Sequence, residues 1–341
     1  MASALKRFLV GKPLASSEEQ HQRLGKPTAL AVFASDAVSS TAYAGEEMLL
    51  VLLMAVTFPN SHHYLVPIAI AAIVLLVLVG FSYVQTIHAY PDGGGAYVVS
   101  RENISPTASL VAGASLLVDY TLTVAVSISS GVMAIGSAFD FNDKVAIRVG
   151  LALFFVMVMA VGNLRGLKES GKVFAIPTYF YVVSLSIFLL ASFYKLFTGD
   201  LNEIEGSKEL AHHFSENHEL MTSATLFVIL RAFSSGAVVL SGVEAISNGV
   251  PAFRKPESRN ASQTLAMMAG ILGLSFLGIS IIAQHLKPVV DEGGETIMSQ
   301  MGAAVFGGGS ILYYCLQFGT FAILIMAANT AYADFPRLSS L

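Results

Sequence analysis

One apolar stretch near the start of the chain is interrupted by acidic and hydroxylated residues, and this interruption limits the possible folds. The stretch from Phe33 to Tyr43 reads Phe-Ala-Ser-Asp-Ala-Val-Ser-Ser-Thr-Ala-Tyr, within an apolar segment over 27–56. Asp36 therefore falls near the middle of a segment long enough to cross a bilayer. A charge at that depth costs about 2.5–3.5 kcal/mol on insertion scales, so it is rare without a partner, a water-filled cavity or a ligand. The stretch predicts a membrane-spanning helix broken at a functional site.

The composition places most of the chain in a membrane. Of its 341 residues, 54% are hydrophobic and 12% are charged, whereas soluble domains carry about 25% charged residues. The lone Cys315 excludes a disulfide within the chain. No basic patch indicates nucleic acid, and no nucleophile–base motif or metal-ligand spacing indicates an enzyme. We therefore expect an all-α, polytopic membrane protein in a lipid bilayer, with no nucleic-acid partner and no enzymatic activity.

Hydropathy predicts eight spans, preceded by a cytoplasmic segment at 1–26 and followed by the start of a cytoplasmic loop at 334–341. The spans are 27–56, 63–88, 106–136, 145–163, 174–197, 223–250, 262–284 and 310–333. Thirteen of the 19 Lys and Arg residues fall on the side that holds the amino terminus, and five fall on the other. The positive-inside rule thus predicts a cytoplasmic amino terminus in the cell membrane. Arg231 lies within the sixth span. It is interpreted either as a structural residue that snorkels or forms an ion pair, or as part of an outer gate.

The first and sixth spans carry related interruptions. The sixth contains Phe233-Ser-Ser-Gly-Ala-Val238, which repeats four residues of Phe33-Ala-Ser-Asp-Ala-Val38 in the same order. A repeat of five helices reverses its orientation in the membrane, as in inverted-repeat transporters. The transporter domain would then cover 27–333, with a first repeat at 27–197 and a partial second repeat at 223–333. Because a second repeat of five spans would continue further, we expect this sequence to be truncated.

The first interruption offers oxygen ligands to an alkali cation. Asp36 supplies a carboxylate, Tyr43 a phenol, and an unwound backbone frees carbonyl groups. We also count Ser39, Ser40 and Thr41 among these ligands. The alternative is a polar packing patch in which small residues let helices approach closely.

The third span carries a second polar strip. Asp119, Tyr120, Thr123 and Ser127 are spaced so that they cluster along one side of a helix. Such a strip within an apolar helix is expected to face the bundle interior or a wet path. Interhelical hydrogen bonding is the alternative interpretation, although it does not explain Asp119.

The sixth span adds a bend and a third acid. Gly242 permits a backbone bend, and Glu244 follows it. Three intramembrane acids with only Arg231 as a counter-charge imply that some are protonated or that a cation is bound. Cation binding and proton coupling therefore both have candidate residues.

Two other features have simpler interpretations. The segment Tyr90-Pro-Asp-Gly-Gly-Gly-Ala-Tyr97 predicts a tight backbone path in a cytoplasmic loop, because it lacks the lysine and spacing of a phosphate-binding loop. The histidines at 62, 63, 212, 213 and 218 are expected to be solvated loop residues rather than metal ligands.

Several of these motifs resemble a known family. Pro91-Asp-Gly-Gly-Gly-Ala-Tyr97, together with Gly242-Val-Glu244, resembles the amino acid–polyamine–cation superfamily. The 33–43 motif and Val118-Asp-Tyr-Thr-Leu-Thr-Val-Ala-Val-Ser127 are similar to its KimA-type potassium importers, a branch related to the KUP family. The resemblance covers essentially the whole chain. It implies a LeuT-like five-helix inverted repeat with broken helices one and six, of which eight of twelve spans are present.

The resemblance also implies site roles. Seven residues would bind the cation: Asp36, Tyr43, Asp119, Tyr120, Thr123, Ser127 and Ser241. Among them Asp36, Tyr43, Thr123 and Ser127 would ligate a potassium ion, while Glu244 and Asp119 would be linked to the proton. No cofactor is implied beyond the transported potassium ion and proton. The family further implies a homodimer and a carboxy-terminal domain that senses a cyclic dinucleotide, which 1–341 does not contain.

The function implied is potassium uptake coupled to protons, a symport by alternating access. An amino-acid or polyamine permease on the same scaffold is the alternative. Asp36 would repel a substrate carboxylate but would accept an amine. A channel is a further alternative. Paired broken helices, however, fit alternating access better than they fit a pore-loop filter.

Overall fold

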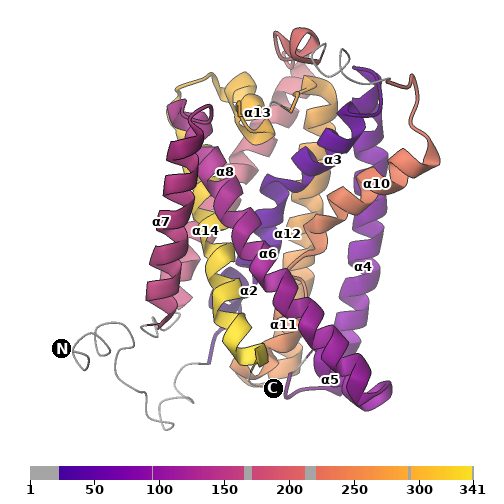
Figure 1. Ribbon diagram of the computed structural model, residues 1–341, viewed down its shortest axis with the longest axis vertical. Helices are drawn as coiled ribbons and strands as arrows, with labels where there is room; N and C mark the ends of the chain where they lie inside the picture. The colour runs from indigo at the N-terminus through magenta and orange to yellow at the C-terminus, as the bar shows by residue number, and fades with distance from the viewer. Residues whose placement is uncertain (1–22, 94, 165–170, 212–219, 291–292, 340–341) are drawn as a thin grey trace, which may run out of the picture.

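The computed structural model describes residues 23–93, 95–164, 171–211, 220–290 and 293–339, and within these ranges the chain is helical with no β-strand. Seven of the described helices are long and apolar enough to cross a membrane. They run alongside one another as an elongated bundle, with the start of α2 and the end of α14 near its lower end (Figure 1). The prediction of an all-α, polytopic fold is confirmed.

The helices occupy all eight ranges that hydropathy predicts. The first comprises α2 (Lys26–Ser39) and α3 (Ala44–Leu53), joined by a 3₁₀ turn at Ser40–Ala42. The sixth comprises α10 (Leu226–Gly236) and α11 (Ala245–Asn248). The other six are α4 (Leu65–Ala89), α6 (Pro106–Phe139), α7 (Val145–Leu164), α8 (Gly171–Thr198), α12 (Glu257–Leu286) and α14 (Ile311–Ser339). Two short helices, α5 (Gly95–Asn103) and α13 (Ile297–Phe306), lie in segments that we predicted as loops.

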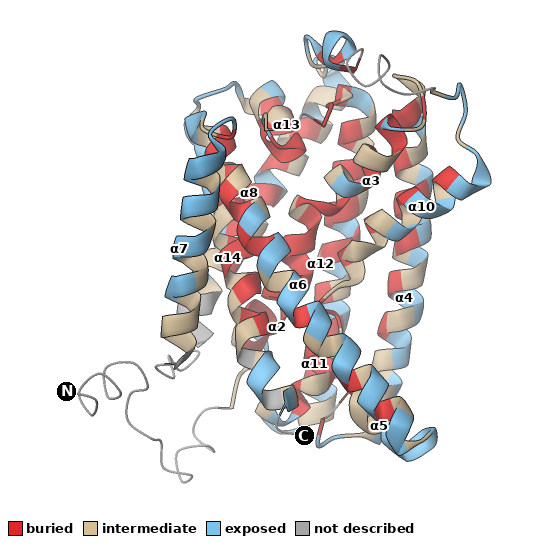
Figure 2. Ribbon diagram, in the orientation of Figure 1, coloured by how far each residue is buried: buried red, intermediate tan, exposed pale blue. Residues whose placement is uncertain are grey.

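Burial separates central helices from peripheral ones. Every residue of α2 from Ala29 to Ser39 is buried, whereas the most apolar window of α7 has no buried residue. Figure 2 shows the same contrast between the interior of the bundle and the outward face of α7. A helix that is apolar all round and buried belongs at the centre of a bundle. The polar break in the first span therefore lies in the protein interior rather than against lipid.

The lower end of α2 is fastened to the segment between α11 and α12. The backbone N–H of Leu24 donates to the carbonyl of Ala252 at 2.8 Å, and Arg254 N–H donates to the carbonyl of Leu24 at 3.1 Å. Further along, the Phe33 ring stacks on Phe253 with centroids 5.3 Å apart. An ion pair between Arg23 and Glu257 adds to this contact. These bonds hold the entry to α2 in place.

The glycine-rich segment before α5 packs on the end of α11. Gly93 and Gly95 have φ angles of +79° and +45°, and a Cβ on Gly95 would lie only 1.8 Å from Asn248 Oδ1. A Cβ on Gly93 would lie 2.6 Å from the Asn248 carbonyl oxygen. The predicted tight backbone path is confirmed, and its physical reason is this close approach.

The start of α3, near the middle of the first span, is tied to α13. Glu46 Oε2 accepts the backbone N–H of Ile297 at 3.1 Å, at the start of α13. The Thr296 hydroxyl accepts from Ser299 N–H at 3.3 Å and so caps the same helix. A carboxylate at a helix N-terminus is stabilised by unpaired N–H groups and by the helix dipole. Outside the spans, Lys287 pairs with Glu203, and the hydrogen bond that it donates lowers the pKa of that carboxyl.

This contact predicts that Glu46 stabilises α13. Glu46→Ala removes a charge-assisted hydrogen bond, so it should cost about 1–3 kcal/mol of local stability and speed amide hydrogen exchange at 297–299. Glu47→Ala is the matched control, because Glu47 is the adjacent exposed acid on α3. Exchange measured by mass spectrometry that is equally fast in both variants would contradict this role.

Candidate functional site

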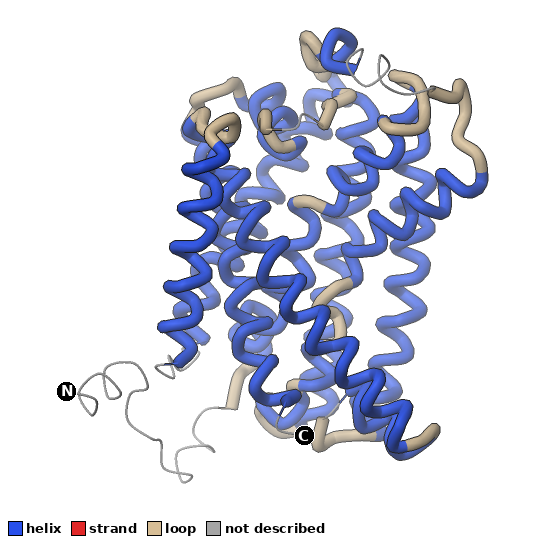
Figure 3. The backbone as a smooth tube through the Cα atoms, in the orientation of Figure 1, coloured by secondary structure: helices blue, strands red, loops and turns tan. Residues whose placement is uncertain are grey.

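The two broken spans meet at their breaks. In the sixth span, a 3₁₀ turn at Ala237–Leu240 is followed by an extended Ser241 and by Gly242 at φ +75°. The first break is milder, because Ser40–Ala42 keeps a helical turn and only Tyr43 departs from it. Ser40 Oγ donates to the Val239 carbonyl at 3.2 Å, which joins the two breaks. Figure 3 shows short non-helical stretches at both breaks, inside the bundle.

The Asp36 carboxyl group lies directly against Gly242. A Cβ on residue 242 would lie 2.7 Å from Asp36 Cγ and 2.8 Å from the backbone nitrogen of Ala37. Asp36 itself is only 7% exposed. The glycine is thus required twice, for its positive φ and for the space that the carboxyl group occupies. This contact places the carboxylate of one broken span at the bend of the other.

Four carboxyl groups lie within electrostatic reach of one another at this site. Asp119, Glu244 and Asp334 all act on Asp36, and Asp119 and Asp334 act on Glu244. Among the described residues, the ion pairs found join other groups, so no Lys or Arg side chain pairs with Asp36, Asp119 or Glu244. Mutual repulsion among Asp36, Asp119 and Glu244 means that a bound cation or proton would stabilise these three groups.

Sequence reasoning missed Asp334. It lies one residue beyond the predicted end of the eighth span, whereas α14 continues through Pro336 to Ser339. The hydropathy pattern predicts a loop at 334–341, where an acid gives no signal of a site. A helix that extends past a proline is the feature that the hydropathy pattern did not reveal.

The strip on α6 is partly as predicted. Tyr120 and Ser127 are buried and Thr123 is half-buried, so these three side chains lie on the inward side. Asp119 is exposed, although its charge reaches Asp36 and Glu244. Because adjacent residues on a helix point about 100° apart, Asp119 falls at the edge of the strip rather than within it.

Other predicted ligands lie at the breaks. Tyr43 is 8% exposed, and its phenol faces Ser241 with the Asp36 charge nearby. Ser127 Oγ is buried and has no hydrogen-bond partner within the described part of the chain. A buried hydroxyl without a partner costs about 1–3 kcal/mol. The Ser127 hydroxyl is therefore available to contact a bound species.

The hydroxyl groups of the first break donate hydrogen bonds to backbone carbonyl groups, which leaves their oxygen lone pairs available, so their role as cation ligands stays a prediction. Ser39, Ser40 and Thr41 donate to the carbonyl groups three residues before them, at 2.6, 2.5 and 2.7 Å. Thr41 Oγ1 also lies 2.8 Å from Tyr181 Oη on α8. Short polar side chains bond to nearby backbone carbonyls in this way. They stabilise the turn at the break.

The prediction that His62 is solvated is wrong. His62 is fully buried, and its Nε2 lies 2.8 Å from the Pro288 carbonyl oxygen. His63 is exposed as expected, and the histidines at 212, 213 and 218 lie outside the described residues. Within the described ranges, no three His, Cys, Asp or Glu side chains are grouped to hold a metal ion. Arg231 is exposed on α10.

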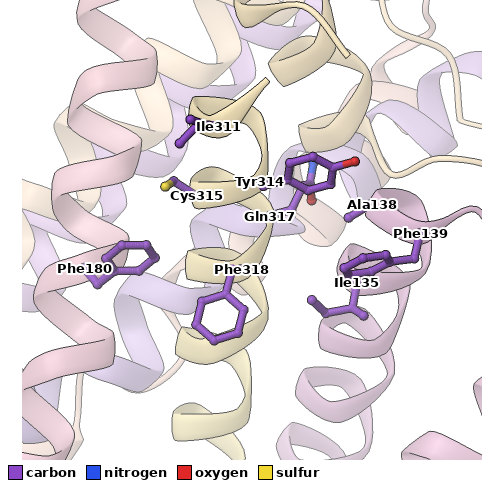
Figure 4. A pocket seen from close by; sticks show the side chains of 9 residues that line it. All are labelled: Ile135, Ala138, Phe139, Phe180, Ile311, Tyr314, Cys315, Gln317 and Phe318. Carbon is purple, nitrogen blue, oxygen red and sulfur yellow. The ribbon is translucent and has the colours of Figure 1, made fainter. Parts of the chain in front are cut away.

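A separate cavity of about 470 Å³ lies between α6, α8 and α14. Figure 4 shows the nine side chains that line it, most of them apolar, including Phe139, Phe180 and Phe318. None of the predicted site residues lines this cavity. The predicted site residues therefore lie apart from this cavity.

A protein-family model described as amino acid permease matches residues 24–340. The chain belongs to the amino acid permease family. The chain is 45% identical over 340 residues to the potassium transporter KimA of Bacillus subtilis (strain 168), covering 99% of this chain and 54% of the relative. It is 25% identical over 279 residues to the low-affinity putrescine importer PlaP of Escherichia coli (strain K12), covering 80% of this chain and 58% of the relative. The chain spans about half the length of the curated relatives that it matches.

The contact between Asp36 and Gly242 gives a testable consequence for the stability of this chain. Gly242→Ala should destabilise the fold by about 1–3 kcal/mol, because the added methyl group overpacks the break. Gly270→Ala is the control, since no atom lies within 4 Å of its Cβ position.

Thermal unfolding in detergent measures both variants. Combining Gly242→Ala with Asp36→Ala should recover part of the lost stability, as expected for residues in contact. Strictly additive effects would show that the two residues do not interact.

Proposed function

We propose that this chain carries potassium uptake coupled to protons, as a symporter that works by alternating access. One observation supports this most strongly: the Asp36 carboxyl group lies against the bend of the second broken span, with three more acids in reach. Carboxylate, phenol and hydroxyl oxygens are hard ligands that suit an alkali cation. The potassium transporter among the relatives supports the same choice of ion.

The proposed roles follow from position. Asp36, Tyr43 and Ser241 surround the junction of the breaks and would bind the cation there. On α6, Tyr120, Thr123 and Ser127 would extend this polar surface. Glu244 follows the bend. There a proton and a cation would compete to neutralise the carboxyl groups of the site. Such competition is the physical basis proposed for coupling.

The remaining expectations belong to this proposal. The amino terminus is cytoplasmic by the positive-inside rule, and the protein is placed in the cell membrane. The two broken spans would belong to inverted repeats. A homodimer, and a cyclic dinucleotide bound outside 1–341, rest on the family resemblance alone.

A polyamine permease is the second candidate. Its support is the similarity to a protein named a putrescine importer, together with the anionic site. Carboxylates bind ammonium groups as well as metal cations, so charge alone does not separate the two. Competition between substrates does.

Tracer uptake into proteoliposomes tests the proposal. Rubidium uptake should rise with an inward proton gradient and fall when excess potassium is added, while putrescine leaves it unchanged. Putrescine accumulation under the same gradient, without rubidium uptake, would favour the second candidate and contradict the first.

Substitutions at the breaks test the assigned roles. Asp36→Asn removes the charge at the junction, and Glu244→Gln removes the proposed proton acceptor. Each should lower gradient-driven rubidium uptake by about 10- to 100-fold, the factor that corresponds to losing a charged partner worth 1.5–3 kcal/mol. Glu244→Gln should still exchange rubidium without a gradient.

Asp143→Asn is the matched control, because Asp143 is exposed in the turn between α6 and α7. It should transport like the unmodified chain, and the amount of each variant in the membrane is measured alongside. Full uptake in Asp36→Asn would remove Asp36 from the site.

A further inference from the structure

Tyr181 on α8 places a buried phenol against the first break. Its side chain is 0% exposed, and its Oη lies 2.8 Å from Thr41 Oγ1, within the 3₁₀ turn of that break. A buried phenol normally finds a hydrogen-bond partner, and here the partner is a residue of the break. Tyr181 lies outside the set of cation ligands that the sequence predicts.

The direction of this hydrogen bond follows from the number of protons. A hydroxyl group has one proton to donate and can accept two hydrogen bonds. Thr41 donates its proton to the Val38 carbonyl oxygen at 2.7 Å. The Tyr181 phenol therefore donates to Thr41 Oγ1, which gives a relay from Tyr181 through Thr41 to Val38. This relay fixes the orientation of the Thr41 hydroxyl group and leaves its oxygen one further lone pair.

The turn that the relay holds joins the two breaks. Ser40 Oγ, next to Thr41, donates to the Val239 carbonyl of the second break at 3.2 Å. Tyr43 follows two residues after Thr41, and its backbone N–H donates to the Ser40 carbonyl at 3.2 Å. Tyr181 thus stabilises, from a third helix, the turn that precedes the predicted ligand Tyr43.

Two other side chains of α8 bond to the first span away from the break. Thr178 Oγ1 donates to the Ala31 carbonyl at 3.0 Å, and Tyr179 Oη donates to the Pro27 carbonyl at 2.8 Å. Both acceptors belong to the helical part of α2. These two bonds fasten one helix to another, whereas the bond from Tyr181 acts on the turn itself.

We propose that Tyr181 is a positioning residue of the cation site: its phenol holds the Thr41 hydroxyl group, and with it the turn of the first break, in the geometry that binds a monovalent cation. The inference rests on the proposed cation transport. Selectivity among alkali cations depends on the size of the oxygen cage and on the field of its oxygen atoms. A turn that can relax would bind the cation less tightly and would distinguish less sharply between ions of different size.

Removal of the phenol hydroxyl group gives the first test. Tyr181→Phe keeps the buried ring but cannot donate to Thr41, so the KM for rubidium uptake should rise about three- to tenfold, the factor that corresponds to one neutral hydrogen bond. Tyr179→Phe is the matched control, because it loses a bond of the same length from α8 to the start of α2. Its KM should equal that of the unmodified chain. Equal KM values in the two variants would overturn the inference.

Ion selectivity gives a readout that a loss of stability does not change. Inhibition of rubidium uptake by potassium and by caesium yields two inhibition constants, and their ratio does not depend on the number of folded molecules. The ratio should move toward one in Tyr181→Phe and stay unchanged in Tyr179→Phe. An unchanged ratio in Tyr181→Phe would show that Tyr181 only stabilises the fold.

Substitution of Thr41 tests the relay from its other end. Thr41→Val removes the hydroxyl group, whereas Thr41→Ser keeps it. Thr41→Val should raise KM at least as much as Tyr181→Phe does, and adding Tyr181→Phe should raise it no further, because both remove the same hydrogen bond. Thr41→Ser should keep KM near that of the unmodified chain. Independent, multiplicative effects of the two substitutions would contradict the relay.

Failure of the proposed transport and failure of this inference give different results. Absence of rubidium uptake in the unmodified chain would overturn the transport and the inference with it. Normal uptake, with a KM and a selectivity ratio that are insensitive to the Tyr181 hydroxyl group, would overturn the inference alone.

Discussion

The Asp36 carboxyl group occupies the space that a side chain at residue 242 would fill, and much of the surrounding structure depends on this contact. Burying a carboxylate within a membrane protein is costly unless it is neutralised or paired. Here the described surroundings supply further acids instead of a base. A bound cation or proton would neutralise these carboxyl groups most directly. This requirement connects the arrangement of the two breaks with the proposed transport.

The rest of the bundle holds this contact in position from both sides. Below the site, the 24–25 segment, Phe33 and Arg23 fasten α2 to 252–257, while the glycines before α5 press on Asn248. Above it, Glu46 joins α3 to α13. In the proposed alternating-access cycle, the lower contacts would have to separate for a cation to leave toward that end. They are a few backbone hydrogen bonds, a ring stack and a partly exposed ion pair, which such a motion could break at modest cost.

Sequence alone located the spans and the breaks because hydropathy and glycine placement are strong local signals. The prediction of a bend at Gly242 is confirmed, and so are helices in all eight predicted ranges. Hydrogen bonds within the first span were harder to foresee. Ser39, Ser40 and Thr41 donate to carbonyl groups three residues before them, and residue type alone does not reveal these bonds. Tertiary placement was also hidden. The burial of His62 depends on the distant Pro288 carbonyl, and α13 depends on a cap from Glu46.

Direct observation of a bound ion tests the central claim most directly. Crystals grown with rubidium, measured by anomalous scattering, should show a peak at ligand distance from the Asp36 carboxylate, Tyr43 Oη and Ser241 Oγ. Potassium added in excess should remove that peak. Anomalous density elsewhere in the bundle, with none beside Asp36, would contradict the account.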